Sequence, residues 1–239
     1  MPPPGACKKP NHKEQLITYN TIREKMGRMV YNEIMKQNPE YKPDFISPLL
    51  LSGGSSANEL TNISGWPIRY AFAMNPYRKK GSGGRTFIMH GRKTKKEAIK
   101  YKLNPVRDVI SGSHILHKDD SIVDGNTSKV IVETCNENGA KRSDFATDSP
   151  LIVNDCYWGV DMKRTNLIAR DAMKELGYSI TDYHKSEKVK KEVVNKVAEM
   201  IGAKKLFVPP LEELLKIMPK GISYCTYCLG GPHPITKKN

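Results

Sequence analysis

Large apolar side chains occupy every second position of residues 66–74, namely Trp66, Ile68, Tyr70, Phe72 and Met74. A period of two places these side chains on one face of an extended chain, because successive side chains of a strand point to opposite faces. The pattern therefore predicts a strand with one buried face. We expect Trp66, Tyr70 and Phe72 to belong to the core.

The residues that follow this strand predict a hairpin and a helix. Residues 75–84 are rich in proline, glycine and basic side chains, a composition typical of a connection, and residues 85–90 have the pattern of the returning strand. Residues 94–103 predict a helix, because Thr94 and Glu97 have the spacing of a capping box.

Apolar positions recur at intervals of three and four in several other segments, which is the pattern of an amphipathic helix. The longest of these segments lies within residues 12–38. The same pattern predicts helices over residues 167–176, over residues 189–201, and over residues 211–218, where Pro210 opens a short helix.

Runs of apolar residues between turn-forming residues predict further strands, over residues 106–110, 129–135, 151–158 and 207–208. The second and third of these strands are expected to pair as a hairpin, and residues 111–120 to form a polar connection. Because the strands precede most of the helices, the sequence predicts an α+β fold. It would comprise an N-terminal amphipathic helix, a mostly antiparallel sheet, then C-terminal helices and an irregular tail with Cys and His.

Proline- and glycine-rich stretches suggest how the chain divides. We expect a flexible arm over residues 1–11, the N-terminal helix with a proline-rich connection over residues 12–51, the main α+β domain over residues 52–220, and an irregular tail over residues 221–239. The Ser-Gly-Gly-Ser-Ser segment, residues 52–56, predicts a flexible joint.

The composition, 38% hydrophobic and 27% charged over 239 residues, is that of a globular chain. No apolar run reaches the length of a membrane span, and the N-terminus lacks the apolar core of a secretion signal. Five cysteines are too few for a disulfide-stabilised secreted domain of this length. We therefore expect an intracellular protein, in the cytosol, the nucleus or the interior of a particle, with no membrane insertion.

Positive charge is concentrated in the predicted hairpin and helix. Residues 69–102 hold eleven Lys or Arg side chains and one acid, in a chain whose net charge is +14. A solvated surface could have this composition, but a field of one sign favours an anionic ligand. We therefore predict a non-enzymatic protein that binds a polyanion, above all nucleic acid. The predicted phosphate contacts are Arg78, Lys79, Lys80, Arg85, Arg92, Lys93, Lys95 and Lys96.

Two other functions fit the sequence. In the first, the chain is a structural component of a large assembly, such as a viral capsid or a ribonucleoprotein particle, and its basic segment docks on acidic protein surfaces. In the second, the chain is a metal-dependent enzyme that acts on nucleic acid. Its metal ion would be held by imidazole and carboxylate groups of one loop: His114, His117, Asp119, Asp120 and Asp124.

Residues 225–233 resemble part of a retroviral-type zinc knuckle, because Cys225, Cys228 and His233 have the spacing of three of its ligands. The resemblance implies a zinc ion held by the three side chains. The fourth ligand position of such a knuckle falls on Lys238, and lysine is a poor zinc ligand. A tetrahedral site would need another ligand from Cys7, His114, His117 or a second chain. Two ordinary thiols in a tail are the alternative interpretation.

Overall fold

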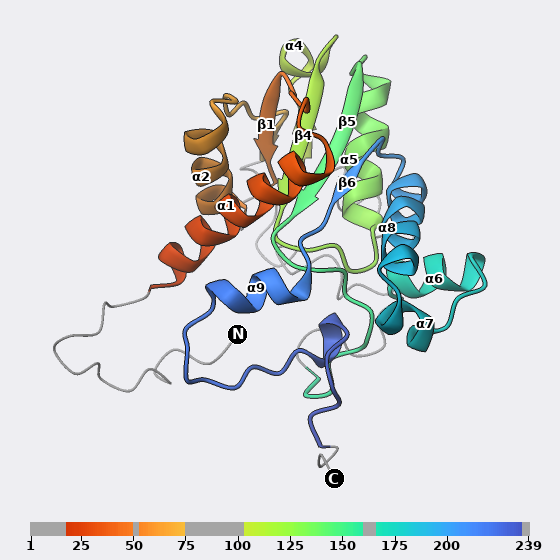
Figure 1. The fold of residues 1–239 in the computed structure, drawn as a ribbon. Coiled ribbons are helices and arrows are strands. Elements are labelled where there is room, and N and C mark those ends of the chain that lie inside the picture. Colours follow the sequence, from red (N-terminus) through yellow and green to blue (C-terminus); the bar gives the residue numbers. More distant parts are fainter. Residues whose placement is uncertain (1–17, 50–52, 75–102, 160–165, 236–239) are drawn as a thin grey trace, which may run out of the picture.

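The computed structural model describes residues 18–49, 53–74, 103–159 and 166–235, and its centre is a four-stranded parallel sheet (Figure 1). The strands are β1 (Phe45–Pro48), β4 (His114–Asp119), β5 (Arg142–Thr147) and β6 (Leu206–Phe207), in the spatial order β1-β4-β5-β6. Each pairing between neighbours in this sheet is parallel. Antiparallel pairing in the described part of the chain is confined to β2 (Phe72–Met74) and β3 (Leu103–Pro105). The predicted α+β fold with a mostly antiparallel sheet is therefore wrong, and the fold is of the α/β class.

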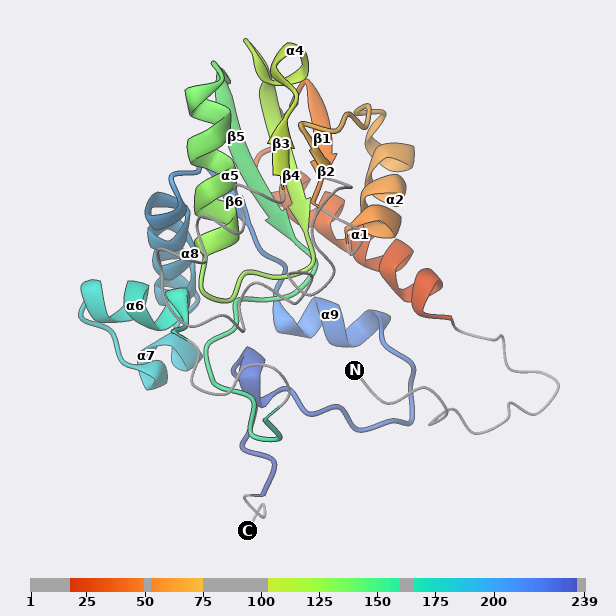
Figure 2. The ribbon, with the colours of Figure 1, turned by 180° about the vertical axis from the view of Figure 1, so that it is seen from behind.

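Helices cover both faces of the parallel sheet (Figure 1 and Figure 2). One face is covered by α1 (Tyr19–Gln37) and α2 (Gly54–Ser64), and the other by α5 (Asn126–Glu137), with α8 (Glu187–Ile201) beside α5. The shorter helices are α4 (Arg107–Ile110), α6 (Ile168–Glu175), α7 (Ile180–Lys185), α9 (Leu211–Ile217) and the 3-10 helix η2 (Tyr227–Leu229). Parallel sheets are covered in this way because both of their faces are apolar.

Each face of the sheet has its own apolar core, because alternate residues of a strand point to opposite faces. Phe45 and Ile115, which are register partners, belong to the core under α5 and α8. The next pair along the same strands, Ile46 and Leu116, belongs to the core under α1 and α2.

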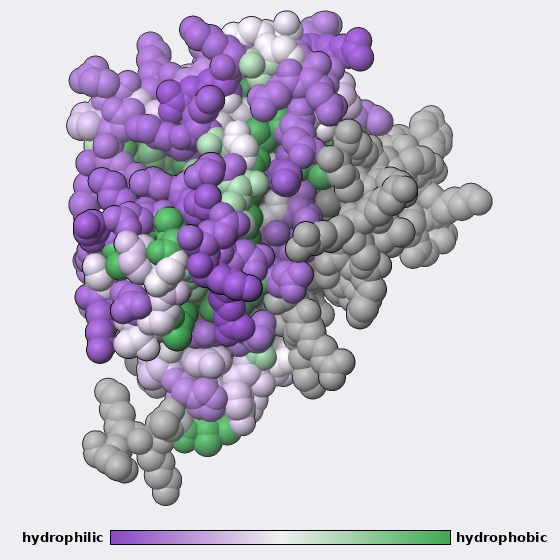
Figure 3. All heavy atoms as spheres, turned by 90° about the vertical axis from the view of Figure 1, so that its right-hand side faces the viewer, coloured by the Kyte–Doolittle hydropathy of each residue, from purple (hydrophilic) through white to green (hydrophobic). Residues whose placement is uncertain are grey.

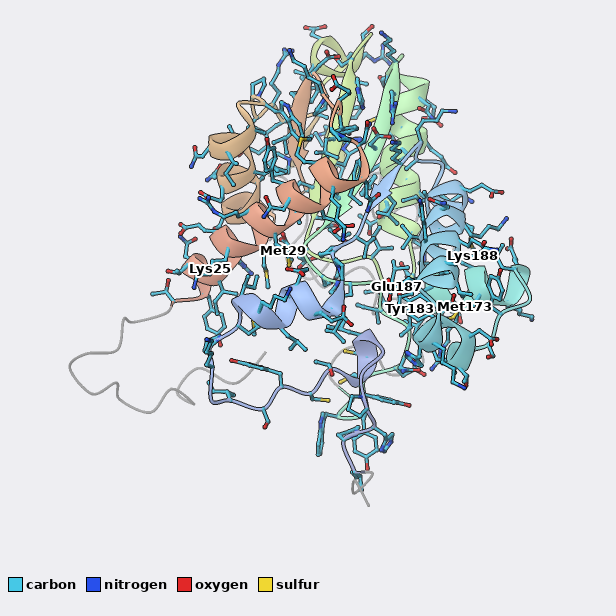
Figure 4. All side chains as sticks on the ribbon, viewed as in Figure 1. Lys25, Met29, Met173, Tyr183, Glu187 and Lys188 are labelled. Carbon is cyan, nitrogen blue, oxygen red and sulfur yellow. The ribbon has the colours of Figure 1, made fainter. Side chains whose placement is uncertain are left out.

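Short helices extend the first of these cores. Met173 of α6 and Tyr183 of α7 are 3% and 7% exposed and lie beside the beginning of α8, whereas Glu187 at that beginning is exposed (Figure 4). Met29 of α1 is buried where α1 approaches α9 (Figure 4).

The helices predicted from intervals of three and four are confirmed, with small shifts at their ends. They correspond to α1, α6, α8 and α9. The hydroxyl group of Ser186 accepts the N–H of Val189 over 3.4 Å and caps α8, and Gly202 ends that helix with a φ of 79°. The predicted strand over residues 207–208 corresponds to β6, one residue earlier.

The predicted hairpin of residues 129–135 and 151–158 is wrong. Residues 129–135 lie in α5, where Val130, Ile131 and Val132 are all buried. A helix that is buried on several sides has the same apolar run as a buried strand, so the pattern does not separate the two. Residues 151–158 form no strand, and residues 106–110 contain the single turn of α4.

The central strand, β4, lies within residues 111–120, which the sequence predicts to be a polar connection. His117 and Lys118 of this strand are fully buried. Buried polar groups require partners, and those of these two side chains include residues from later in the chain, Cys135 beside His117 and Asp148 beside Lys118. The neighbouring strand β5 contains Arg142 and Asp144 and is likewise missed by a search for apolar runs.

The predicted strand over residues 66–74 forms in part. Phe72–Met74 is β2, and Ile68 makes one isolated parallel bridge to Ile46. Trp66 is buried, as predicted, and Phe72 packs against the core. Tyr70 is 63% exposed, so its assignment to the core is wrong.

The close crossing of α1 and α2 depends on Gly27. The contact between these helices orders residues 53–56, part of the segment predicted to be a flexible joint. A Cβ atom on Gly27 would lie 2.3 Å from the backbone oxygen of Ser56, so only glycine allows the two helices to approach this closely. Residues 53–56, predicted as part of a flexible joint, include the first turn of α2 instead.

Several predictions fall outside the described residues. These are the arm over residues 1–11, the strand over residues 85–90, most of the helix over residues 94–103, and the eight predicted phosphate contacts between Arg78 and Lys96. The proposed division into domains stays a prediction. Within the described ranges, no helix is both long and apolar enough to cross a membrane. The face formed by α5, α6, α7 and α8 is mostly hydrophilic, with small apolar areas between the polar ones (Figure 3).

Candidate functional site

The carboxyl ends of β1, β4 and β5 meet at one edge of the sheet, which we call the carboxyl edge. Open α/β sheets bind their ligands outside this edge, where the connecting loops converge. Two of the connections are joined by backbone hydrogen bonds. The N–H of Asp148 donates to the backbone oxygen of Asp119 over 3.2 Å, and the N–H of Ser149 donates to the backbone oxygen of Asp120 over 3.0 Å.

Two adjacent carboxylates, Asp119 and Asp120, stand at the carboxyl edge where β4 ends. Asp119 is half-buried and accepts the backbone N–H of Asp120 over 2.8 Å, whereas Asp120 is exposed. Burial, and then the nearby charge of Asp120, raise the pKa of Asp119 to about 8. Ionised carboxylates accept hydrogen bonds only, so the pair in its ionised form suits a ligand with neighbouring hydroxyl groups.

The loop after this pair leads directly into the amino-terminus of α5. Ile122 anchors the loop in the core, and the oxygen of Val123 accepts the N–H of Ile168 over 3.0 Å. Gly125 precedes α5 with a φ of 71°, a left-handed conformation that favours glycine. The amino-terminus of a helix carries partial positive charge and N–H groups without helical partners, so it binds anions such as phosphate.

A buried ion pair, Lys118 with Asp148, lies next to the carboxylate pair. The Lys118 ammonium group is 2.7 Å from Asp148 Oδ1 and donates to the backbone oxygen of Asp119 over 2.8 Å. Ser56, in the first turn of α2, donates to Asp148 Oδ2 over 2.8 Å. The oxygen of Lys118 also accepts the N–H of Leu49, just after β1, over 2.8 Å. Lys118 therefore joins the connections that follow β1, β4 and β5.

Burial and charge oppose each other at Asp148. Burial raises the pKa of its carboxyl group, and the adjacent Lys118 ammonium and the Ser56 hydroxyl lower it in part. Because both members of the pair are almost completely buried, neither can exchange its partner for water. The pair is therefore a fixed element of the carboxyl edge.

An apolar cavity of about 460 Å³ lies between β1, β2, β3 and the first turns of α2 and α5. Its lining residues are Pro48, Leu49, Gly54, Tyr70, Phe72, Ala73, Leu103, Val106, Thr127 and Ile131. Thr127 belongs to the first turn of α5, so the cavity opens beside the helix amino-terminus that follows the carboxylate pair. The carboxyl edge thus combines acceptors for hydroxyl groups, a place for an anion and an apolar hollow.

His114, predicted as a metal ligand, lies at the other end of β4 in a polar cluster around Asp144. Asp144 Oδ2 accepts from the Tyr41 hydroxyl over 2.9 Å and from Arg142 Nε over 2.8 Å, and it is 2.7 Å from His114 Nε2. Burial raises the pKa of Asp144, but hydrogen bonds from His114, Arg142 and Tyr41 outweigh it and hold that pKa below its usual value. Burial and the charge of Asp144 raise the pKa of Tyr41, so its hydroxyl group keeps its proton.

His117, the other predicted histidine ligand, points into the core under α5. Its Nε2 atom is 3.6 Å from the sulfur of Cys135. Burial lowers the pKa of His117 to about 3 and raises that of Cys135 to about 12, so both side chains are neutral. The two histidines and the three aspartates therefore do not gather around one point. In the described part of the chain, no group of three or more His, Cys, Asp or Glu side chains could hold a metal ion.

The predicted zinc ligands lie in the tail after α9. Burial raises the pKa of the Cys228 thiol, and the nearby Cys156 and Cys225 raise it further. The ring of His233 makes edge contacts with Tyr157 and Tyr227, with ring centres 4.8 and 4.9 Å apart. Cys156 and Cys225 both lie close enough to Cys228 to act on its thiol. A zinc ion on Cys225, Cys228 and His233 stays a prediction.

The sequence predicts Asp119, Asp120 and Asp124 as candidate ligands. It does not identify Lys118, Asp148 or the role of the loop between β4 and α5. The available signal was an acid pair followed by small polar residues and then an apolar run. That signal indicates a strand, a loop and a helix only if residues 129–135 are assigned to a helix.

No family model matches the chain, but its sequence is similar to amidophosphoribosyltransferases. It is 34% identical over 201 residues to the Saccharomyces cerevisiae amidophosphoribosyltransferase, a match that covers 84% of this chain and 34% of that protein. It is 29% identical over 224 residues to the Archaeoglobus fulgidus amidophosphoribosyltransferase, which covers 92% of this chain and 42% of that protein. The chain thus spans about a third to two-fifths of the length of these curated relatives.

The fold is similar to that of the B. subtilis glutamine phosphoribosylpyrophosphate (PRPP) amidotransferase, solved in complex with ADP and GMP. The TM-score is 0.64 with 26% sequence identity, over 90% of this chain and 42% of that chain. These relatives are enzymes, so the predictions of a non-enzymatic protein, a nucleic-acid partner and a viral or other structural assembly are wrong. Over most of its own length, and over less than half of theirs, the chain is similar to amidophosphoribosyltransferases.

Proposed function

We propose that this chain binds PRPP at the carboxyl edge and supplies the PRPP-binding part of an amidophosphoribosyltransferase. One observation carries the proposal. The carboxylate pair Asp119 and Asp120 is followed, on the same loop, by the amino-terminus of α5. The similarity to enzymes whose names include phosphoribosyl transfer supports it.

The chemistry of PRPP fits these groups one by one. Its ribose carries two neighbouring hydroxyl groups, for which Asp119 and Asp120 are acceptors. Its phosphate ester is an anion of the kind that the amino-terminus of α5 binds. Its diphosphate is the leaving group, and the apolar cavity beside Thr127 limits the access of water to the carbon from which it leaves. An intracellular location, as expected from the sequence, suits a phosphorylated substrate of this kind.

We expect the Asp119→Asn/Asp120→Asn variant to bind PRPP at least a hundredfold more weakly than the unaltered chain. Above pH 8, where Asp119 is ionised, each substitution removes a charged acceptor, and a hydrogen bond to a charged group is worth about 1.5–3 kcal/mol. Isothermal titration calorimetry with PRPP and Mg²⁺ measures the change. Asp108→Asn is the matched control, because Asp108 is an exposed acid in α4, before β4 begins, and its loss should leave the affinity unchanged.

A folded, unaltered chain that releases no heat with millimolar PRPP would refute the proposal. Release of diphosphate from PRPP in the presence of ammonium ions then tests the transfer step. Ammonium serves as the amine source, so this assay does not require the part of the relatives that the chain does not match.

The affinity for PRPP is expected to rise with pH through the pKa of Asp119, which is raised to about 8. The groups that act on this carboxyl group are Asp120 and Lys118. Below its pKa Asp119 is protonated and a poorer acceptor, so affinity should fall by up to tenfold for each pH unit below 8. Calorimetry from pH 6.5 to 9 measures this slope. Asp119→Asn should be flat with pH, and an equal slope in that variant would contradict the assignment.

The raised pKa of Asp119 makes stability change with pH in the direction opposite to the affinity for PRPP. The folded chain holds the proton of Asp119 more tightly than the unfolded chain does. The contribution of this group to stability is therefore lost as the pH rises from about 4 to about 8. Ligand binding and folding should thus respond to pH in opposite directions over this range.

A further inference from the structure

The ammonium group of Lys118 lies behind the carboxylate pair, on the other face of the sheet. Successive side chains of a strand point to opposite faces. Lys118 points to the same face as Leu116, which belongs to the core under α1 and α2, whereas Asp119 points to the face covered by α5. The side chain of Lys118 is 0% exposed, so it does not touch a ligand at the carboxyl edge. A group so placed acts on a ligand through the residues in front of it.

Hydrogen bonds from Lys118 and from the loop after β5 hold the backbone of both carboxylates. The backbone oxygen of Asp119 accepts from the Lys118 ammonium group over 2.8 Å and from the N–H of Asp148 over 3.2 Å. The ammonium group and Asp148 Oδ1, 2.7 Å apart, close a ring of three contacts. The backbone oxygen of Asp120 accepts the N–H of Ser149 over 3.0 Å. Because the short aspartate side chain has few rotamers, the position of the backbone largely fixes where each carboxylate lies.

Stability alone does not account for an ion pair in this place. Two charges lose much of their hydration on burial, and apolar residues of similar volume often stabilise a protein as well or better. The pair is nevertheless almost completely buried, and Ser56 of α2 donates a further hydrogen bond to Asp148 over 2.8 Å. The contacts that the pair makes with Asp119 therefore point to a role at the carboxyl edge.

We propose that Lys118 and Asp148 are positioning residues that hold Asp119 and Asp120 where they accept the two ribose hydroxyl groups of PRPP. The inference rests on the proposed function. The pair neither touches the ligand nor takes part in the transfer. Its loss displaces the acceptors, so the chain then distinguishes poorly between a sugar that has both hydroxyl groups and a sugar that has one of them.

The test compares the affinities for ribose 5-phosphate and 2-deoxyribose 5-phosphate by calorimetry, above pH 8, where Asp119 is ionised. The two ligands share the phosphate monoester and differ in one hydroxyl group. We expect the unaltered chain to bind ribose 5-phosphate at least about tenfold more tightly, the effect of one hydrogen bond to a charged group. In Lys118→Met/Asp148→Asn this ratio should fall below about threefold.

Two further variants separate positioning from a loss of stability. Asp144→Ala is the matched control, because it removes a buried acceptor shared by Tyr41, His114 and Arg142 at the other end of the sheet. It should destabilise the chain and leave the ratio of affinities unchanged. Ser56→Ala removes one hydrogen bond to Asp148 and keeps both charges of the pair. It should lower the ratio in the same direction, but by less than the double variant.

A lower ratio in the double variant, with an unchanged ratio in Asp144→Ala, supports the inference. A folded double variant that keeps the full ratio overturns it and leaves the proposed function standing. If the double variant does not fold, Ser56→Ala decides by the same criterion. An unaltered chain that binds PRPP without favouring ribose 5-phosphate also overturns the inference, because the carboxylate pair then accepts no hydroxyl group. An unaltered chain that binds no PRPP refutes the proposed function, and the inference with it.

Discussion

Replacement of Lys118 by methionine is expected to lower the free energy of unfolding by about 3–5 kcal/mol. Methionine keeps the length of the apolar stem but removes the ammonium group, and Asp148 then stays buried without its counter-charge. The backbone oxygen of Asp119 also loses the hydrogen bond that the Lys118 ammonium group donates. Urea unfolding followed by circular dichroism measures the change.

A second variant tests whether the unpaired charge causes this loss. Adding Asp148→Asn to Lys118→Met removes the orphaned carboxylate and keeps a partner for Ser56, so at least half of the lost stability should return. Lys216→Met is the matched control, because Lys216 forms an exposed ion pair with Glu213 in α9. Its loss should cost less than about 1 kcal/mol. A double variant no more stable than Lys118→Met would contradict the explanation.

Replacement of Asp144 by alanine is expected to cost about 3–4 kcal/mol, because three donors lose one shared acceptor in a buried place. Tyr41→Phe removes one of these hydrogen bonds and keeps the ring contacts with Trp66 and Phe207, so it should cost about 1 kcal/mol. Chemical unfolding of both variants compares the two losses. Equal losses would mean that the Tyr41 bond alone stabilises the cluster.

The effect of Asp144→Ala should depend on pH in a defined direction. The pKa of Asp144 is lowered in the folded chain, so its contribution is complete above its ordinary value of 3.8 and is lost as the pH falls through the folded-state pKa. The difference in stability between the unaltered chain and the variant should therefore shrink in acid. A difference that stays constant down to the acid transition would show that packing, not charge, explains the loss.

The parts of the fold that sequence predicts correctly are those whose stability comes from one apolar stripe. α8 is an example, because Val189, Val193 and Val197 are buried on one face and Ser186 caps the helix by a local bond. Both signals are contained within a few neighbouring residues. One of the wrong predictions concerns α5, where Val130, Ile131 and Val132 are buried next to one another, so that no single apolar stripe marks the helix.

The sheet could not be predicted because its two central strands bury charged and polar side chains. Lys118 is stable inside the protein only beside Asp148, and His114 pairs with Asp144, which follows it by thirty residues. Local sequence contains neither pairing, so these strands have the composition of surface loops. The candidate site inherits this difficulty. Asp119 and Asp120 attract attention as acids, but their role depends on a strand before them and a helix after them.

Ser56 takes part in two contacts at once, and this limits how the protein can vary. Its backbone oxygen lies so close to Gly27 that a Cβ atom on Gly27 would clash with it. Its hydroxyl group donates a hydrogen bond to Asp148. A substitution that separates α1 from α2 would therefore also displace the hydroxyl group that holds the Lys118–Asp148 pair at the carboxyl edge. The packing of α1 against α2 is thus constrained by the geometry of that edge.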